Sequence, residues 1–131
     1  MSRRLTGFSP LVRNQIKERA GFDEDTRYAR CEGCGKWYAE GFYELHHRIP
    51  RGSGGTKRIH VNLAANGLCF GRDCCHAFAE SERNEAYDRG WLISQHRKNI
   101  TPCDVPVQMH DGTWLLDNDG NKYRIPDRRA S

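Results

Sequence analysis

Hydrophobic and polar positions recur at helical spacing in the first part of the chain. Within 11–20 the apolar residues form one narrow stripe, and charged residues such as Arg19 are expected to face solvent. Ser9 can cap the first turn, and Pro10 suits the first helical position. Gly21 follows the last position, where helices commonly end. The pattern therefore predicts an N-terminal helix that packs through its apolar stripe.

The middle of the chain changes to a weak alternation that is typical of strands. Residues 42–49 alternate and are rich in aromatic side chains, which predicts a strand. Residues 50–57 form a glycine-rich loop, after which 61–68 return as a short strand or an extended piece. A helix is expected over 75–88, ended by Gly90, which can adopt the left-handed backbone of a helix exit.

The last part of the chain consists of short strand candidates separated by turns. Residues 113–116 and 122–125 are apolar or aromatic segments, and they flank 118–121, which reads Asn-Asp-Gly-Asn. Such a segment between two strand candidates is a strong signal for a hairpin turn. We therefore expect a small C-terminal β-hairpin appendage, about 91–126, on the same domain.

The composition limits the number of domains and the size of the core. The chain has 131 residues, of which 37% are hydrophobic. This length suits a single domain, 1–131, with a modest core. A structural metal would supply folding free energy that burial alone does not provide in so small a domain. The mixture of predicted helices and strands indicates the α+β class.

The charge balance bears on the partners and the location of the protein. The chain has 21 Lys and Arg against 17 Asp and Glu, a formal net charge of +4. A mildly basic chain suits a polyanionic partner. No apolar run approaches the roughly 20 residues that span a bilayer. No apolar signal segment follows the charged N-terminus. We expect a cytoplasmic protein with no membrane partner.

The cysteines suggest a metal site. In a reducing compartment the six cysteines favour metal thiolates over three disulfides. Cys31 and Cys34 have the two-residue gap of a tetrahedral zinc site. The other half is expected to be Cys69 with Cys75, and Cys74 is the alternative to Cys75, because spacing alone does not decide between them. The long gap between the two halves leaves room for an inserted active-site module.

Two adjacent histidines, His46 and His47, lie in the expected middle strand. Successive side chains of a strand point to opposite faces, so the two imidazoles cannot easily bind one ion together. They can instead divide two tasks, in which one holds a metal ion and the other takes a proton from water. This division of tasks indicates nuclease chemistry.

Together these residues resemble the HNH endonuclease family, and in particular its small bacteriophage-encoded members. The resemblance covers about 28–90 and implies a zinc-stapled ββα-metal (HNH/His-Me) finger of two strands and one helix. The matching residues are Glu44-Leu45-His46-His47, Gly54-Gly55, Asn62-Leu63 and Cys75-His76, framed by Cys31, Cys34 and Cys69.

The resemblance implies a role for each matching polar side chain. His47 resembles the general base, and Asn62 resembles the residue that pins the loop so that this base is oriented. His46 and His76 match two ligands of a catalytic divalent ion, for which Mg²⁺, Mn²⁺, Ni²⁺ and Zn²⁺ are candidates. Glu80 lies four residues after His76, on the same helical face, and is either a third ligand or holds a water on the ion. The alternative for Glu80 is a solvated or ion-paired carboxylate.

Basic residues near the glycine-rich loop are candidates for contact with DNA. These residues are Arg48, Arg51, Lys57 and Arg58. Positive charge there would attract the phosphate backbone, and the alternative is a solvated loop. The helix at 11–20 likewise either packs with a wet face or contacts DNA. The family implies little direct reading of bases, so binding largely without sequence specificity is expected.

The function implied by the resemblance is metal-dependent hydrolysis of DNA phosphodiester bonds. It implies a structural Zn²⁺, a catalytic divalent ion, and products with a 5′-phosphate and a 3′-hydroxyl. Likeness to phage members suggests DNA packaging or processing beside the phage terminase, in the host cell cytoplasm. Homing and restriction stay open. The alternative function is a non-catalytic zinc-stabilised DNA-binding module, which has no need of the complete histidine set.

Overall fold

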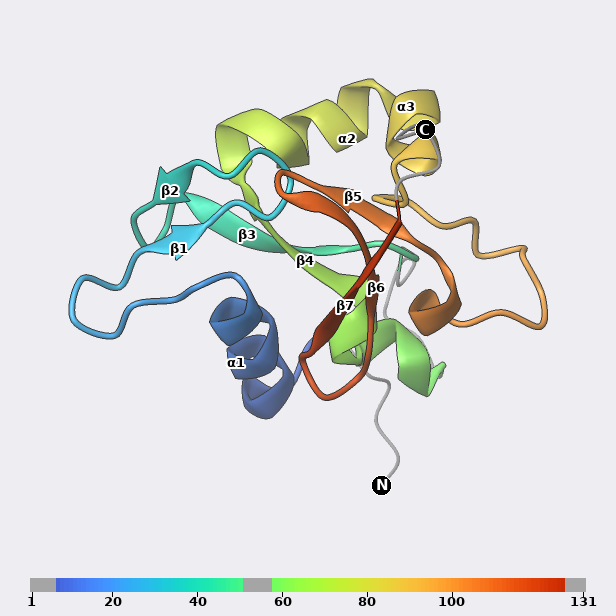
Figure 1. The fold of residues 1–131 in the computed structure, drawn as a ribbon, viewed down its shortest axis with the longest axis horizontal. Coiled ribbons are helices and arrows are strands. Elements are labelled where there is room, and N and C mark those ends of the chain that lie inside the picture. Colours follow the sequence, from blue (N-terminus) through green and yellow to red (C-terminus); the bar gives the residue numbers. More distant parts are fainter. Residues whose placement is uncertain (1–6, 51–57, 127–131) are drawn as a thin grey trace.

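The computed structural model describes residues 7–50 and 58–126, which form a mixed α+β arrangement (Figure 1). The α+β class expected from the sequence is confirmed. The helices are α1 (Pro10–Arg19), α2 (Ala77–Ser81) and α3 (Arg83–Asp88). The strands are β1 (Ala29–Arg30), β2 (Trp37–Tyr38), β3 (Tyr43–His47), β4 (Gly67–Gly71), β5 (Val107–Met109), β6 (Gly112–Leu116) and β7 (Lys122–Ile125).

The N-terminal helix α1 forms where the sequence predicts it. The Ser9 hydroxyl accepts a hydrogen bond from the backbone N–H of Val12 at 3.2 Å, and Gly21 leaves the helix at a φ of +82°. Val12 and Ile16 are buried, as the apolar stripe requires. Arg19 differs from the prediction, because its side chain is only 1% exposed and pairs with Glu32.

The two central strands, β3 and β4, form an antiparallel pair. His46 lies opposite Leu68, and His47 lies opposite Gly67. Strand β3 confirms the predicted strand at 42–49. Every residue of β4 is buried, so this strand is covered on both of its faces.

The segment before β4 differs from the extended piece expected at 61–68. It forms 3-10 turns at Ile59–Asn62 and Ala64–Asn66, and the strand begins only at Gly67. The buried Asn66 side chain explains this course. It donates to the carbonyls of Ile49 and Val61 and accepts from the N–H of Ile49, so it ties the turn to the end of β3.

The predicted helix at 75–88 is divided into three pieces. A π-helical turn, Arg72–His76, precedes α2, and α3 follows after a break at Glu82, whose φ and ψ are −113° and 64°. Gly90 then ends the helical region at a φ of +74°, as expected. A π turn has a wider backbone loop than an α turn, and such turns often lie at functional sites.

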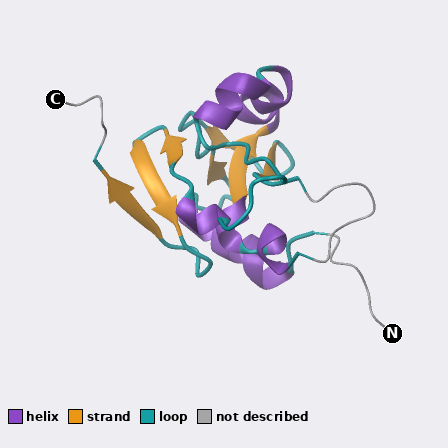
Figure 2. Cartoon of the chain, turned by 90° about the vertical axis from the view of Figure 1, so that its right-hand side faces the viewer, coloured by secondary structure: helices purple, strands orange, loops and turns teal. Residues whose placement is uncertain are grey.

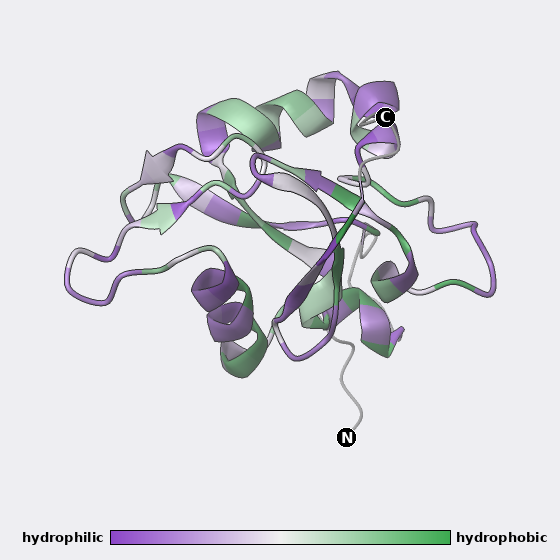
Figure 3. Cartoon of the chain, in the orientation of Figure 1, coloured by the Kyte–Doolittle hydropathy of each residue, from purple (hydrophilic) through white to green (hydrophobic). Residues whose placement is uncertain are grey.

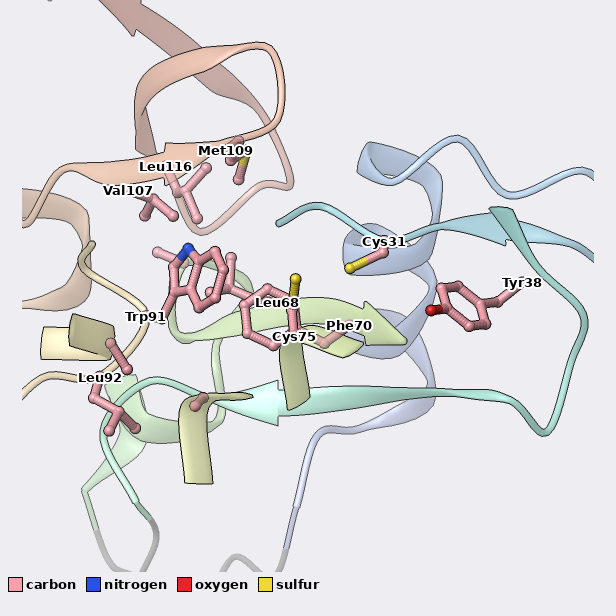
Figure 4. Packing of buried hydrophobic residues seen from close by; sticks show 13 residues of the cluster. Cys31, Tyr38, Leu68, Phe70, Cys75, Trp91, Leu92, Val107, Met109 and Leu116 are labelled. Atoms are coloured by element: carbon pink, nitrogen blue, oxygen red, sulfur yellow. The ribbon is translucent and has the colours of Figure 1, made fainter. Parts of the chain in front are cut away.

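The C-terminal strands form a three-stranded antiparallel sheet in the order β5-β6-β7. The predicted hairpin is present as β6–β7, but the term appendage is wrong. Val107 and Leu116 of this sheet pack in the same buried cluster as Trp91 and Cys75 (Figure 4). The sheet therefore completes the core beside the central strands.

Buried side chains gather on both sides of β3–β4. Leu68 and Phe70 point into a cluster with Trp91 and the C-terminal sheet, whereas Cys69 points into a cluster with α1. This split follows from the alternation of side chains along a strand. Figures 1 and 2 show α2 and α3 on the opposite side of β3–β4 from α1. Figure 3 shows the polar residues of α1 on one side of the helix and apolar residues on the other.

Candidate metal centre and histidine cluster

A cluster of four thiols forms where β1, the following turn and the π turn meet. The sulfur atoms of Cys31, Cys34, Cys74 and Cys75 all lie within 4.8 Å of one another. Cys74 Sγ is 3.5 Å from Cys34 Sγ and 3.6 Å from Cys31 Sγ. Tetrahedral zinc with Zn–S bonds of about 2.3 Å separates its sulfurs by about 3.8 Å. The donor set and its spacing therefore fit a metal ion such as zinc.

Glycines let the turn between Cys31 and Cys34 approach the other two thiols. A Cβ on Gly33 would lie 2.6 Å from the Cys75 sulfur and 2.9 Å from Cζ2 of Trp91, so a side chain has no room there. Gly35 adopts a φ of +84°, and its N–H donates to the Cys31 carbonyl at 2.8 Å. The turn can therefore lie close against the Cys75 thiol and the Trp91 ring.

The structure corrects the predicted ligand set at Cys69. Its side chain lies on the α1 side of β4, in the buried cluster around Ile16, and it does not belong to the thiol cluster. The Cys69 N–H donates to the Glu32 carboxylate at 2.8 Å. Cys74 and Cys75, treated as alternatives in the sequence, both belong to the cluster.

The thiols of the cluster differ in acidity. Contact with the Cys75 thiol lowers the pKa of Cys31 to about 5, although burial opposes this shift. Burial raises the pKa of Cys34 to about 11. The pKa of Cys75 is also raised, because Cys31 carries the negative charge beside it. A metal ion requires thiolates, so its binding would release protons from this cluster.

His46 is buried, and its side chain lies on the face of β3 where Phe70 and Trp91 pack. Its ring stacks on Phe70 with centroids 5.1 Å apart, and Nε2 lies 2.7 Å from the Trp91 carbonyl oxygen. Burial lowers the pKa of His46 to about 4, so the imidazole is neutral near pH 7. A neutral ring can bond this carbonyl only as a donor, so the lone pair lies on Nδ1.

His76 lies beside His46 and between two carboxylates. The two imidazole centroids are 5.8 Å apart with an interplanar angle of 72°. His76 Nδ1 is 3.1 Å from Glu44 Oε2, and Nε2 is 3.7 Å from Glu80 Oε1. Glu44 was not predicted to have a role of its own. The signal was available, because Glu44 precedes His46 by two positions and therefore shares its face of the strand.

Glu80, the expected third ligand, does not complete a metal site with the two histidines. In the part of the chain that the structure describes, the four thiols are the only group of three or more possible ligands within 4.8 Å. His46, His76 and Glu80 are neighbours but do not form such a group. Glu44 and Glu80 lie beside His76, so two imidazoles and two carboxylates are neighbours at this side of β3.

His47 occupies the opposite face of β3 from His46. Its Nε2 is 3.0 Å from Oδ1 of Asn62. The Phe8 ring stacks on the imidazole with centroids 4.0 Å apart and an interplanar angle of 8°. Phe8 was not predicted to lie at the site, because it is far away in the chain and only folding brings it there.

The predicted DNA contacts require a correction at Arg48. Its side chain is fully buried and donates to the carbonyls of Gly90, Ala65, Pro102 and Val105 at 2.7 to 2.9 Å. Burial lowers the pKa of Arg48 to about 9, so it stays charged near pH 7. Arg48 therefore joins loops inside the protein and cannot touch DNA.

Of the other residues predicted to contact DNA, the structure describes Arg58 alone. Arg58 is half-buried, and its guanidinium donates to the Gln95 carbonyl at 3.3 Å and lies 3.3 Å from Nε2 of His60. Arg51, Lys57 and the Gly54-Gly55 pair of the motif lie outside the described residues.

Comparisons with known proteins identify no relative of this chain. No protein-family model, no curated protein and no solved structure matches the chain. Within 7–50 and 58–126, no helix has the length and apolar character needed to cross a membrane.

Proposed function

We propose that this protein is a metal-dependent DNA endonuclease of the HNH type. The observation that carries the proposal is that two successive histidines of one strand, His46 and His47, lie on opposite faces of that strand. His46 is neutral and lies beside His76 on one face of β3, whereas His47 is bound to Asn62 on the other. Neighbouring residues thus offer a pair of nitrogen ligands and an oriented base.

His47 is the proposed general base. When Nε2–H donates to Asn62 Oδ1, the lone pair of the neutral imidazole lies on Nδ1, and this atom is the proposed proton acceptor. The water oxygen then forms a bond to phosphorus as the bond from phosphorus to the 3′ oxygen breaks. The products are a 5′-phosphate and a 3′-hydroxyl.

His46 and His76 are the proposed ligands of a catalytic divalent ion. The hydrogen bond from His46 Nε2–H to the Trp91 carbonyl is typical of metal-binding histidines, because it fixes the tautomer and the ring. Glu44 orients His76 in the same way through Nδ1. Mg²⁺, Mn²⁺, Ni²⁺ or Zn²⁺, when bound, would stabilise negative charge on the leaving oxygen.

The four-thiol cluster has a structural role in this proposal. Zinc there would join the turn after β1 to the π turn that carries His76, and so hold one ligand of the catalytic ion in place. DNA is the proposed partner, bound mainly through its backbone. A role beside the phage terminase in the host cell cytoplasm follows from the resemblance to phage members.

The second candidate is a zinc-stabilised DNA-binding module without catalysis. One observation favours it, since the described residues do not bring His46, His76 and a third possible ligand atom all within 4.8 Å of one another. The two functions differ in the use of the histidines. A binding module tolerates loss of His47, whereas an endonuclease does not.

Cleavage of supercoiled plasmid separates these candidates. Wild type, His47→Ala and His76→Ala would be matched for fold and zinc content, then assayed with EDTA or with Mg²⁺, Mn²⁺ or Ni²⁺. His96→Ala is the matched control, because His96 is exposed. We expect ion-dependent cutting by wild type and His96→Ala and its loss in the other two variants. DNA binding without cutting under every condition would favour the binding module.

A further inference from the structure

We propose that Phe8 is a positioning residue for His47, and this inference rests on the proposed endonuclease function. The two rings are nearly parallel, at 8°, with centroids 4.0 Å apart. Phe8 itself is buried, so its ring is a fixed surface and not a loose cover. It lies directly before the N-cap of α1, far in sequence from the strand that carries the base.

The space for this stacking comes from the residue opposite His47. That residue is Gly67 on β4. A Cβ on Gly67 would lie 2.9 Å from Cζ of Phe8 and would also overlap Cδ1 of Ile16. The absence of a side chain at Gly67 therefore lets α1 come close enough for Phe8 to lie flat on the imidazole.

The far end of α1 is fastened to the same strand. Arg19 Nη2 donates to the Gly67 carbonyl at 2.5 Å, and Nη1 donates to the Ala64 carbonyl at 3.1 Å. The same guanidinium binds both carboxylate oxygens of Glu32, at 2.7 and 2.9 Å. These buried contacts fix α1 at its C-terminal end, so Phe8 at the other end has a defined place.

Two contacts then restrain the imidazole in different directions. Asn62 holds Nε2 within the ring plane through one hydrogen bond at 3.0 Å. The Asn62 hydrogen bond acts within the plane of the ring, whereas the flat face of Phe8 opposes tilting of the ring out of that plane. Correct orientation of a base acts on the chemical step, so Phe8 should affect kcat more than KM.

The test compares Phe8→Leu and Phe8→Ala with wild type in plasmid cleavage over a range of DNA concentrations at saturating ion. Leu keeps an apolar side chain but lacks the flat face. We expect kcat to fall by about ten- to a hundredfold in both variants, the range typical of residues that orient a catalytic group. KM for DNA should stay within about twofold, because no DNA contact is removed.

Two matched controls on α1 separate orientation from folding. Leu11→Ala changes an exposed residue of the same helix, at 68% exposure, and should leave kcat unchanged. Val12→Ala removes buried volume from the same cluster but keeps the Phe8 ring that stacks on the imidazole. A fall in kcat for Val12→Ala equal to that for Phe8→Leu would overturn the proposal, since the effect would then be structural.

A spectroscopic measurement tests the stacking itself. The face of Phe8 should shift the His47 ring protons upfield in the NMR spectrum, and Phe8→Leu should remove that shift. Unchanged kcat in active Phe8 variants would sink the inference and leave the nuclease standing. A wild type that never cuts DNA would remove the proposed function, and the positioning role with it.

Discussion

The Nε2 atom of His46 lies 2.7 Å from the carbonyl oxygen of Trp91, the residue that follows Gly90 after α3. Trp91 in turn donates from its indole to the Gln108 carbonyl at 2.8 Å and packs against the core around Cys75. Strand β3, the exit of α3 and strand β5 are thereby joined at one residue. The proposed ligand His46 is thus oriented by backbone from a distant part of the chain.

The four-thiol assignment is tested by zinc content and thermal stability. We expect wild type to hold about one equivalent of zinc. Cys74→Ser should lose this zinc, and its free energy of unfolding should fall by several kcal/mol. Cys69→Ala should keep its zinc, because the Cys69 side chain lies outside the cluster. Cys103→Ser is the control. Zinc loss in Cys69→Ala with retention in Cys74→Ser would reverse the assignment.

Arg48 should be a stability residue and not a DNA contact. Arg48→Met leaves four buried carbonyls without their donor, so we expect a loss of at least about 3 kcal/mol in urea unfolding. Arg97→Met, at an exposed position, should stay within about 0.5 kcal/mol of wild type. A stable Arg48→Met variant with weakened DNA binding would contradict the buried role.

Gly67 should tolerate a side chain poorly for a steric reason alone. Its φ of −109° is open to any residue, but an added Cβ would overlap Ile16. We expect Gly67→Ala to cost about 1–3 kcal/mol in denaturant unfolding. Ile16→Val shortens the opposing side chain, so the double variant should lose less stability than the sum of the two single variants. Strict additivity would show that the overlap is not the cause.

Glu44 should affect metal dependence more than Glu80 does. Glu44 is 3.1 Å from His76, whereas Glu80 is 3.7 Å away and more exposed. In the proposed nuclease, Glu44→Gln should raise the ion concentration for half-maximal cutting by about 10- to 100-fold. Glu80→Gln, of the same size and chemistry, is the comparison and should have the smaller effect. Equal shifts in the two variants would refute this ranking.

Local signals in the sequence predicted several elements of the fold. Ser9 and Pro10 marked the start of α1, and Gly90 marked the end of the helical region. The Asn-Asp-Gly-Asn turn at 118–121 predicted the β6–β7 hairpin. Each signal acts through the backbone of its own segment, so no distant contact was needed to interpret it.

The errors concern residues whose environment depends on distant parts of the chain. Cys69 faces α1 because β4 begins at Gly67, and the start of that strand depends on Asn66 binding back to Ile49. Arg48 directly follows the two histidines and precedes a polar loop, and this position in the sequence suggested that its side chain is on the surface. Its four acceptors come from distant turns that the sequence does not place together.

The ion pair between Arg19 and Glu32 links the two sides of the molecule. Glu32 directly follows Cys31, so removing a metal from the thiols would loosen the carboxylate that neutralises a buried guanidinium. A buried charge without its partner is strongly unfavourable, so α1 should detach from β4 when the thiol site empties. Metal loss and release of the N-terminal helix would then be a single cooperative transition, although the thiols and Phe8 lie on opposite sides of the central strands.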